Sequence, residues 1–339
     1  MITPEDIKKI KDYLEKSENP LFFFDDDPDG LASFLLLWKH IGRGHGVMVK
    51  GKPEVSEEYV RKVNEYHPDK VFILDKPMLS QDFVNKDNVP IIHIDHHPPI
   101  KIKGTHYFNP LLNDPKDNRP TSYWCYQVTQ QNQWIAMIGI IGDWFIPEFA
   151  KEFTKKYPKI LPKVNNPAQA LFNTEFGKLV KVFSFIQKGK TSDTMRCVRV
   201  LTRINNPNEI LEQTTKEGKF IYRYYEKVNK EYEKVLEEAK KKSGDKLILF
   251  TYPSLKDSFT GNLANELSSK YPNKLIIIGR DKGDKVIMSL RSEKYNVRDI
   301  IEKAVEGLDG YGGGHEHACG SNISKDDYSE YIKRIKEQL

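Results

Sequence analysis

The most constraining feature of this sequence is a set of short apolar runs that each stop at an aspartate. Residues 21–27 are apolar and then abruptly acidic, residues 71–74 lead to Asp75, and residues 89–94 lead to Asp95. Such short runs, with helical patterns between them, are typical of buried parallel strands that helices cover on both faces. We therefore expect an α/β fold with a parallel sheet in the first half of the chain.

Carboxylates and histidines gather where these predicted strands end. The carboxyl ends of strands in an open parallel sheet meet at one crevice. The side chains expected there are Asp25, Asp27, Asp29, Asp75 and Asp95. A single aspartate after a strand is usually a turn former or a helix cap. The set as a whole favours a different interpretation, because so many carboxylates in one cleft need counter-charge. Divalent cations supply it, and aspartate with histidine suits Mn²⁺, with Mg²⁺ possible.

The strand signal disappears in the middle of the chain and returns near the end. Residues 147–243 have helical patterns only, and from residue 244 short strands again alternate with helices. We expect three parts: a metal-binding α/β domain at 1–146, a helical connector at 147–243 and a smaller α/β domain at 244–339. Within the first part, Thr121 and Ser122 follow Pro120 and are interpreted as caps of a helix near the cleft.

Composition excludes several classes of protein. No apolar run approaches the 18 or so residues of a membrane span. The polar N-terminus does not resemble a signal peptide, and the three cysteines are too widely spaced for a disulfide framework or a zinc site. We expect a cytoplasmic protein with no membrane partner. The formal net charge is +5, and setting aside seven acidic residues in or beside the cleft leaves about +12 for the rest, which suits a polyanionic substrate. The seven are Asp25, Asp26, Asp27, Asp29, Asp75, Asp95 and Asp143.

Asp95-His96-His97, after the apolar residues 91–94, resembles the signature motif of the DHH phosphoesterases. Three other segments of the first half resemble further motifs of that family, at 24–33, 72–75 and 140–143. Near the C-terminus, residues 289–292 and 312–320 resemble the arginine element and the glycine-rich motif of the DHH-associated C-terminal domain. The layout is most similar to archaeal RecJ-like nucleases and to nanoRNases. One position departs from the family pattern: Asp25 stands where the first motif commonly has histidine, and it adds a negative charge to the site.

The resemblance implies a role for each matching residue. One divalent cation, preferably Mn²⁺, would be held by Asp25, Asp27 and Asp75. A second would be held by Asp29, Asp75, His96 and Asp143, so that the pair can hydrolyse a phosphodiester by a two-metal mechanism. His97 would contact the scissile phosphate or assist the leaving oxygen, and Asp95 would orient a histidine or act as a direct ligand. Substrate phosphate would be bound by Arg291, Gly312, Gly313, Gly314 and His315.

Three functional hypotheses follow from the resemblance. The first is an exonuclease for single-stranded DNA or RNA. The second is a phosphodiesterase for very short oligonucleotides or a cyclic dinucleotide. The third, favoured only by Asp25, is an inactive scaffold in a replication assembly, where replication or repair proteins would be the partners.

Overall fold

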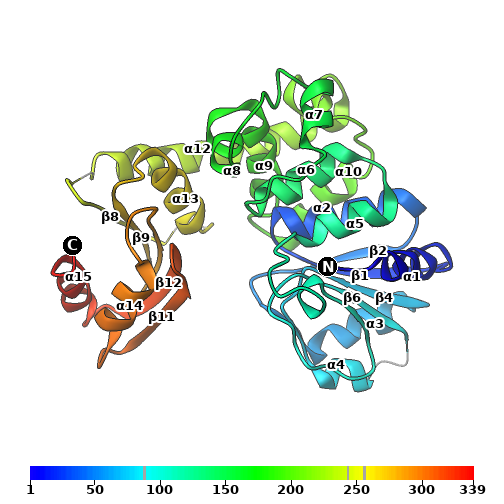
Figure 1. Ribbon diagram of the computed structural model, residues 1–339, viewed down its shortest axis with the longest axis horizontal. Coiled ribbons are helices and arrows are strands. Elements are labelled where there is room, and N and C mark those ends of the chain that lie inside the picture. Colours follow the sequence, from blue (N-terminus) through cyan, green and yellow to red (C-terminus); the bar gives the residue numbers. More distant parts are fainter. Residues whose placement is uncertain (87–88, 243, 255–256) are drawn as a thin grey trace. The chain divides into compact units, whose positions relative to one another are not determined.

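A five-stranded, wholly parallel sheet organises the first half of the chain (Figure 1), as the apolar runs predict. Its strand order is β2-β1-β4-β6-β7. The strands are β1 (Pro20–Asp25), β2 (His45–Val49), β4 (Lys70–Leu74), β6 (Ile91–Ile94) and β7 (His106–Phe108). The central strands are apolar on both sides because both faces of the sheet are covered.

Strand β1 shows how the two faces are packed. Phe22 and Phe24 lie against Phe34 of helix α2 (Pro28–Ile41) on one face. Phe23 points the other way and contacts Tyr59 and Phe83. The helices on that second face are α3 (Val60–Tyr66) and α4 (Gln81–Lys86). On the first face, α2 packs against α5 (Thr121–Thr129) and α6 (Gln133–Gly142), and α1 (Pro4–Glu15) contacts α5. A short parallel pair, β3 (Glu54–Val55) and β5 (Met78–Leu79), lies outside the main sheet.

The middle of the chain is helical, as predicted. Its helices are α7 (Ala150–Lys156), α8 (Pro167–Asn173), α9 (Glu175–Ile186), α10 (Thr191–Leu201), α11 (Asn208–Leu211) and α12 (Lys216–Lys240). None of the helices within the described ranges combines the length and the apolar character that a membrane span requires.

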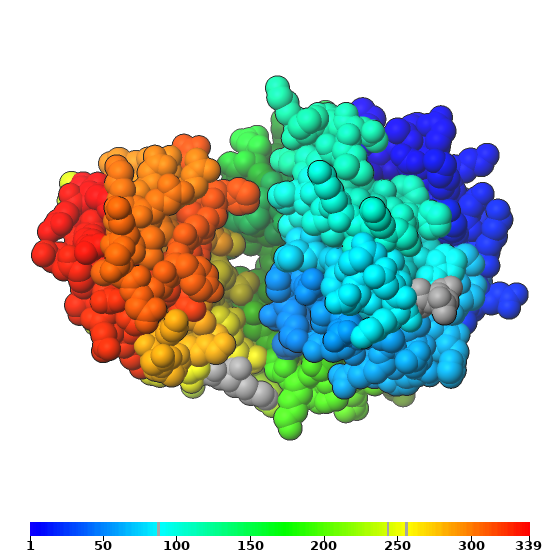
Figure 2. Space-filling model, turned by 90° about the horizontal axis from the view of Figure 1, so that it is seen from below, coloured from blue at the N-terminus to red at the C-terminus, as the bar shows by residue number. Residues whose placement is uncertain are grey.

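A second five-stranded sheet, mostly antiparallel, forms the last part of the chain, with strand order β11-β12-β10-β9-β8. The strands are β8 (Leu247–Tyr252), β9 (Leu275–Lys282), β10 (Lys285–Arg291), β11 (Gly310–His315) and β12 (Ala318–Ser324). Helices α13 (Thr260–Lys270), α14 (Val297–Val305) and α15 (Tyr328–Lys336) accompany it. Figure 2 shows the orange and red segments that follow β9 forming much of the visible surface of this part.

The computed structural model describes residues 1–86, 89–242, 244–254 and 257–339. The chain divides into two compact units, Met1–Glu226 and Lys227–Leu339, and the boundary falls within α12. The fold class, with a parallel-sheet domain, a helical region and a smaller α/β domain, is therefore confirmed. The finer division at 1–146, 147–243 and 244–339 stays a prediction, and its boundary residue Ser243 lies outside the described residues.

Candidate metal centre

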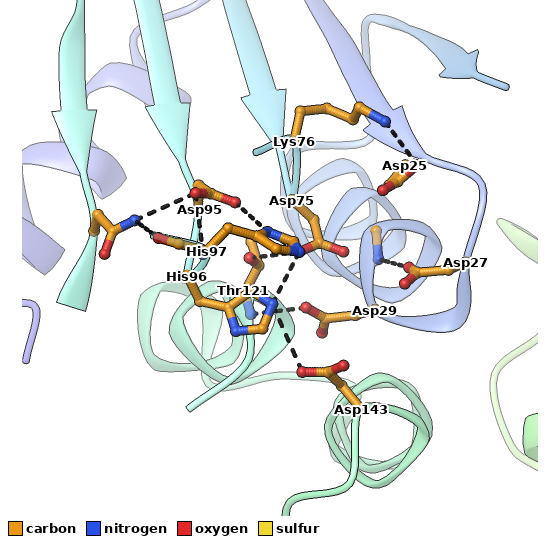
Figure 3. A network of polar contacts seen from close by, with 12 residues as sticks. Asp25, Asp27, Asp29, Asp75, Lys76, Asp95, His96, His97, Thr121 and Asp143 are labelled. Atoms are coloured by element: carbon orange, nitrogen blue, oxygen red, sulfur yellow. Dashed lines mark hydrogen bonds and ion pairs between the residues drawn. The ribbon is translucent and has the colours of Figure 1, made fainter. Parts of the chain in front are cut away.

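The chain brings six aspartates and two histidines together at the carboxyl edge of the first sheet (Figure 3). Asp25 ends β1, Asp75 follows β4 directly, and Asp95 follows β6. Asp27 is the N-cap of α2, and Asp143 is the C-cap of α6. Within the described part of the chain, three groups of side chains each have ligand atoms within 4.8 Å of one another: Asp25 with Asp27 and Asp75, Asp29 with His96 and Asp143, and Asp75 with His96 and His97. Each predicted metal ligand belongs to at least one group, and Asp75 and His96 each belong to two.

The turn between β1 and α2 lets the start of the helix lie very close to the end of the strand. The Asp27 carboxylate accepts the Gly30 amide at 2.9 Å, which satisfies one free N–H of the helix start. A Cβ on Gly30 would lie 2.6 Å from the backbone nitrogen of Asp25. Glycine therefore lets the first turn of α2 rest directly on the end of β1, and this contact brings Asp25, Asp27 and Asp29 to one place.

Asp29 belongs to the first turn of α2, and its side chain points to the N-terminus of α5. The residue is 1% exposed. It accepts the backbone amides of Thr121 at 2.8 Å and Ser122 at 2.9 Å, and also the Ser122 hydroxyl. A carboxylate in this position is stabilised by the unpaired amides and the dipole of the helix. The interpretation of Thr121 and Ser122 as capping residues is wrong, because the N-cap is Pro120, which makes no side-chain capping hydrogen bond. No pattern in the sequence indicated that these residues instead hold the cleft carboxylates.

Asp75 has a left-handed backbone conformation, with φ of 59°, and is 1% exposed. A non-glycine residue with this conformation carries strain that the surrounding structure must support, and such strain is common at functional sites. The Thr121 hydroxyl donates to its carboxylate at 3.1 Å, and His96 Nε2 lies 3.4 Å from the same oxygen. Asp75 thus stands in the centre of the cluster.

Asp95 is fully buried and holds His97 rather than joining a ligand group. His97 Nδ1 lies 2.8 Å from Asp95 Oδ1, and the His97 amide donates to Oδ2 at 3.1 Å. The Asn109 side-chain amide and the Tyr107 hydroxyl also donate to Oδ2, at 3.2 and 3.4 Å. Burial alone would lower the pKa of His97, but its hydrogen bond to Asp95 and the charge of Asp95 outweigh that effect, so the pKa is raised. Of the two histidines, Asp95 orients His97.

The electrostatics of the cluster fit a divalent cation. Burial, followed by the charges of neighbouring aspartates, holds the pKa of both Asp75 and Asp143 well above the usual range. The same causes raise the pKa of Asp27 to about 7. Burial lowers the pKa of His96, which favours the neutral imidazole that binds metals. Crowded carboxylate oxygens beside a neutral imidazole form the donor set that Mn²⁺ and Mg²⁺ accept.

A lysine of the protein itself also reaches this cluster. Lys76 is 1% exposed, and its ammonium donates to Asp25 Oδ1 at 2.8 Å and to the Lys52 carbonyl at 2.5 Å. The extra negative charge expected from Asp25 is therefore paired. Sequence reasoning missed Lys76, whose one signal was its place directly after Asp75.

The predicted phosphate-binding residues lie in the second unit. Arg291 ends β10, where its guanidinium donates to Asn265 at 2.7 Å and to the carbonyls of Leu290 and Cys319. The three glycines form part of the edge strand β11 rather than a loop. A Cβ on Gly312 would clash with Ile301, whereas Gly313 faces open space. A cavity of about 420 Å³ beside them is lined by residues that include Tyr311, Gly312 and Gly313. His315 ends β11 and is exposed.

Comparisons with known proteins agree with this architecture. Residues 244–339 match the DHHA1 domain. No curated protein matches the sequence. Among solved structures, a DHH domain from a protein described as a member of a ribosomal protein family is 15% identical, with a TM-score of 0.66 over 98% of this chain and 89% of that one.

Two further solved structures share the fold over nearly the whole of this chain. RecJ from Thermus thermophilus, in complex with Mn²⁺, is 14% identical with a TM-score of 0.59. The match covers 100% of this chain but only 55% of that one, so this chain spans about half the length of that relative. The pGpG-specific phosphodiesterase PggH from Vibrio cholerae is 15% identical, with a TM-score of 0.50 over 95% of this chain and 98% of that one. The match at residues 244–339 confirms the resemblance of this part to the DHH-associated C-terminal domain, and the solved structures share the fold that the DHH resemblance implies, while the likeness to archaeal members stays a prediction.

Proposed function

We propose that this chain is a metal-dependent phosphodiesterase that degrades single-stranded DNA or RNA from an end, as a RecJ-like exonuclease. The observation that carries the proposal is the convergence of the aspartates and His96 from three strand ends and two helices on one small volume. A fold alone does not define an activity. This donor set, on a fold shared with RecJ and PggH, supports phosphodiester hydrolysis.

The residues of the cluster would hold two divalent cations, with Mn²⁺ preferred and Mg²⁺ possible. One position would use Asp25, Asp27 and Asp75, and the other Asp29, Asp75, His96 and Asp143. When bound, such cations activate water and neutralise charge on a phosphate. RecJ from Thermus thermophilus was solved with Mn²⁺ and also with Mg²⁺, which agrees with this choice of metals.

His97 is the side chain that we expect to contact the substrate. Asp95 engages its Nδ1, so in the neutral tautomer with a proton on Nδ1 the Nε2 atom is unprotonated and can accept a proton or a hydrogen bond. Protonated His97, which the raised pKa favours, donates from both nitrogens and can stabilise the leaving oxygen. Asp95 acts through His97 and is a positioning residue. In the second unit, Arg291, Gly312, Gly313, Gly314 and His315 would bind the nucleotide phosphates.

A specific observation favours a second candidate, a phosphodiesterase for very short oligonucleotides. The chain shares its fold with PggH, a pGpG-specific phosphodiesterase, over 95% of this chain and 98% of that one.

The experiment offers end-labelled strands of about 2 to about 40 nucleotides to the protein with Mn²⁺. Asp75→Ala and His96→Ala should each lower the rate at least about 100-fold, because loss of an outer-shell partner alone costs 10- to 100-fold. Glu57→Ala, which removes an exposed carboxylate paired with Lys86, is the matched control and should leave the rate unchanged.

Stepwise degradation of strands of every length supports the exonuclease. Activity on the shortest strands alone supports the second candidate. No hydrolysis with Mn²⁺ or Mg²⁺ would rule out both and leave the scaffold hypothesis.

A further inference from the structure

Lys76 is a buried positive charge placed against one of the candidate metal ligands. Its side chain is 1% exposed, and its ammonium makes one contact to a carboxylate and one to a backbone carbonyl. Burying a charged group is costly unless it is paired and hydrogen-bonded. Both partners are fixed, because Asp25 ends β1 and the second partner is the Lys52 backbone. The ammonium is thus part of the structure of this edge of the sheet.

Asp25 is shared between this ammonium and the ligand cluster. Its Oδ1 accepts Lys76 at 2.8 Å and the Asp26 amide at 2.7 Å. An oxygen of Asp25 also belongs to the ligand group with Asp27 and Asp75. Figure 3 shows the consecutive residues Asp75 and Lys76 diverging, with Asp75 directed into the cluster and Lys76 extended towards Asp25. The two consecutive residues after β4 therefore place a negative and a positive charge beside Asp25.

The other ligand group has a different environment. Asp29 accepts two backbone amides and a hydroxyl, and Asp143 lies 3.6 Å from His96. Backbone amides and a hydroxyl orient Asp29, and among the described residues no lysine or arginine pairs with Asp29 or Asp143 as Lys76 pairs with Asp25. A cation held by Asp25, Asp27 and Asp75 would instead be repelled by an ammonium one carboxylate away. Such repulsion is strong in a poorly solvated cleft.

We propose that Lys76 is a built-in competitor of the metal at the Asp25, Asp27 and Asp75 group, so that this chain has one tight and one weak cation position. The inference rests on the proposed function, because both take the cluster to be a cation site. The inference adds which of the two cation positions is filled last. Lys76 would act through Asp25 and touch neither substrate nor metal.

The test is a Mn²⁺ titration of the whole chain at fixed pH, with free Mn²⁺ measured by its electron paramagnetic resonance signal. The wild type should bind one ion tightly and a second more weakly. Lys76→Met should strengthen the weaker step by about tenfold or more, because it removes a neighbouring positive charge. Asp25→Asn should have the opposite effect and weaken that step. A merely structural role for Lys76 would weaken binding in both variants.

Lys52→Met is the matched control, because it removes a nearby but half-exposed lysine charge that pairs with Glu58. It should leave both steps unchanged. Where Lys76→Met does not fold, the double variant Asp25→Asn with Lys76→Met removes both members of the buried pair. Its weaker step should then be stronger than that of Asp25→Asn alone.

Two equally tight steps in the wild type would overturn the inference. A second step that is no stronger in Lys76→Met than in the wild type, or no stronger in the double variant than in Asp25→Asn, would overturn it as well. A single step in the wild type that becomes two in Lys76→Met would support it. The readout is binding alone, so a protein that binds Mn²⁺ as described but hydrolyses nothing would contradict the proposed function and leave the role of Lys76 standing.

Discussion

At the scale of single residues, the Asp95–His97 pair offers the sharpest test, because the two side chains have separate tasks. Asp95→Asn keeps the shape of the side chain but replaces a charged acceptor with a neutral one. We expect the pKa of His97 to fall and the rate of phosphodiester hydrolysis to drop about 10- to 100-fold. Titration of the His97 imidazole by nuclear magnetic resonance, beside the rate, measures both effects.

The same pair predicts a pH dependence of stability. The pKa of His97 is raised in the folded state, so its protonation stabilises the fold at low pH. This contribution should be lost as the pH rises through the folded-state pKa of His97, and it should be smaller in Asp95→Asn. Asp117→Asn is a suitable control, because Asp117 is also buried but pairs with Arg119. It should lower stability without moving the His97 titration. An unchanged His97 pKa in Asp95→Asn would contradict the assigned role.

At the scale of elements, the site depends on how closely α2 approaches β1. Gly30→Ala would place a Cβ 2.6 Å from the Asp25 nitrogen, and the helix start must then move. We expect a loss of about 1–3 kcal/mol in the free energy of unfolding, as for other overpacked positions. Because Asp27 and Asp29 move with the helix, Mn²⁺ affinity should fall as well. Urea unfolding and Mn²⁺ titration measure the two effects.

Gly42→Ala tests the opposite end of the same helix. Gly42 has φ of 68° with no atom near the added Cβ, so the cost is only the strained backbone, about 1 kcal/mol. Its Mn²⁺ affinity should be unchanged. Equal loss of metal affinity in the two variants would show that general weakening of α2, rather than the contact at Asp25, controls the site.

Elements also show how far the sequence alone could predict this protein. The apolar runs ending in aspartate predicted the parallel strands and the meeting of Asp25, Asp27, Asp29 and Asp75 at one edge, because strand direction in such a sheet decides where side chains meet. His96 and Asp143 entered the predicted ligand set through the family resemblance. The partners of those ligands could not be predicted in this way. Thr121 and Ser122 reach Asp29 only through the packing of α5 on α2. Lys76 meets Asp25 because neighbouring parallel strands end side by side, at residues 51 positions apart.

At the scale of the whole molecule, the two compact units have separate cores. A cluster around Phe23, Ile73 and Phe83 belongs to the first unit, and another around Ile277, Leu290 and Tyr331 belongs to the second. All the candidate metal ligands lie in the first unit, between Asp25 and Asp143. Metal binding should therefore stabilise one unit and leave the other unchanged.

Differential scanning calorimetry with and without Mn²⁺ tests this expectation. A ligand that binds only the folded state stabilises it by about 2.7 kcal/mol at 100 times its Kd. We expect two transitions, of which Mn²⁺ raises only one, and removal of metal with a chelator should return it to its original temperature. Asp75→Ala should abolish the shift, since the proposed function assigns Asp75 to both cation positions. Val286→Ala, in the core of the second unit, should instead lower the transition that does not respond to Mn²⁺. A single transition that Mn²⁺ shifts as a whole would mean that the two units unfold together, and the separate cores would then not act as separate cooperative units.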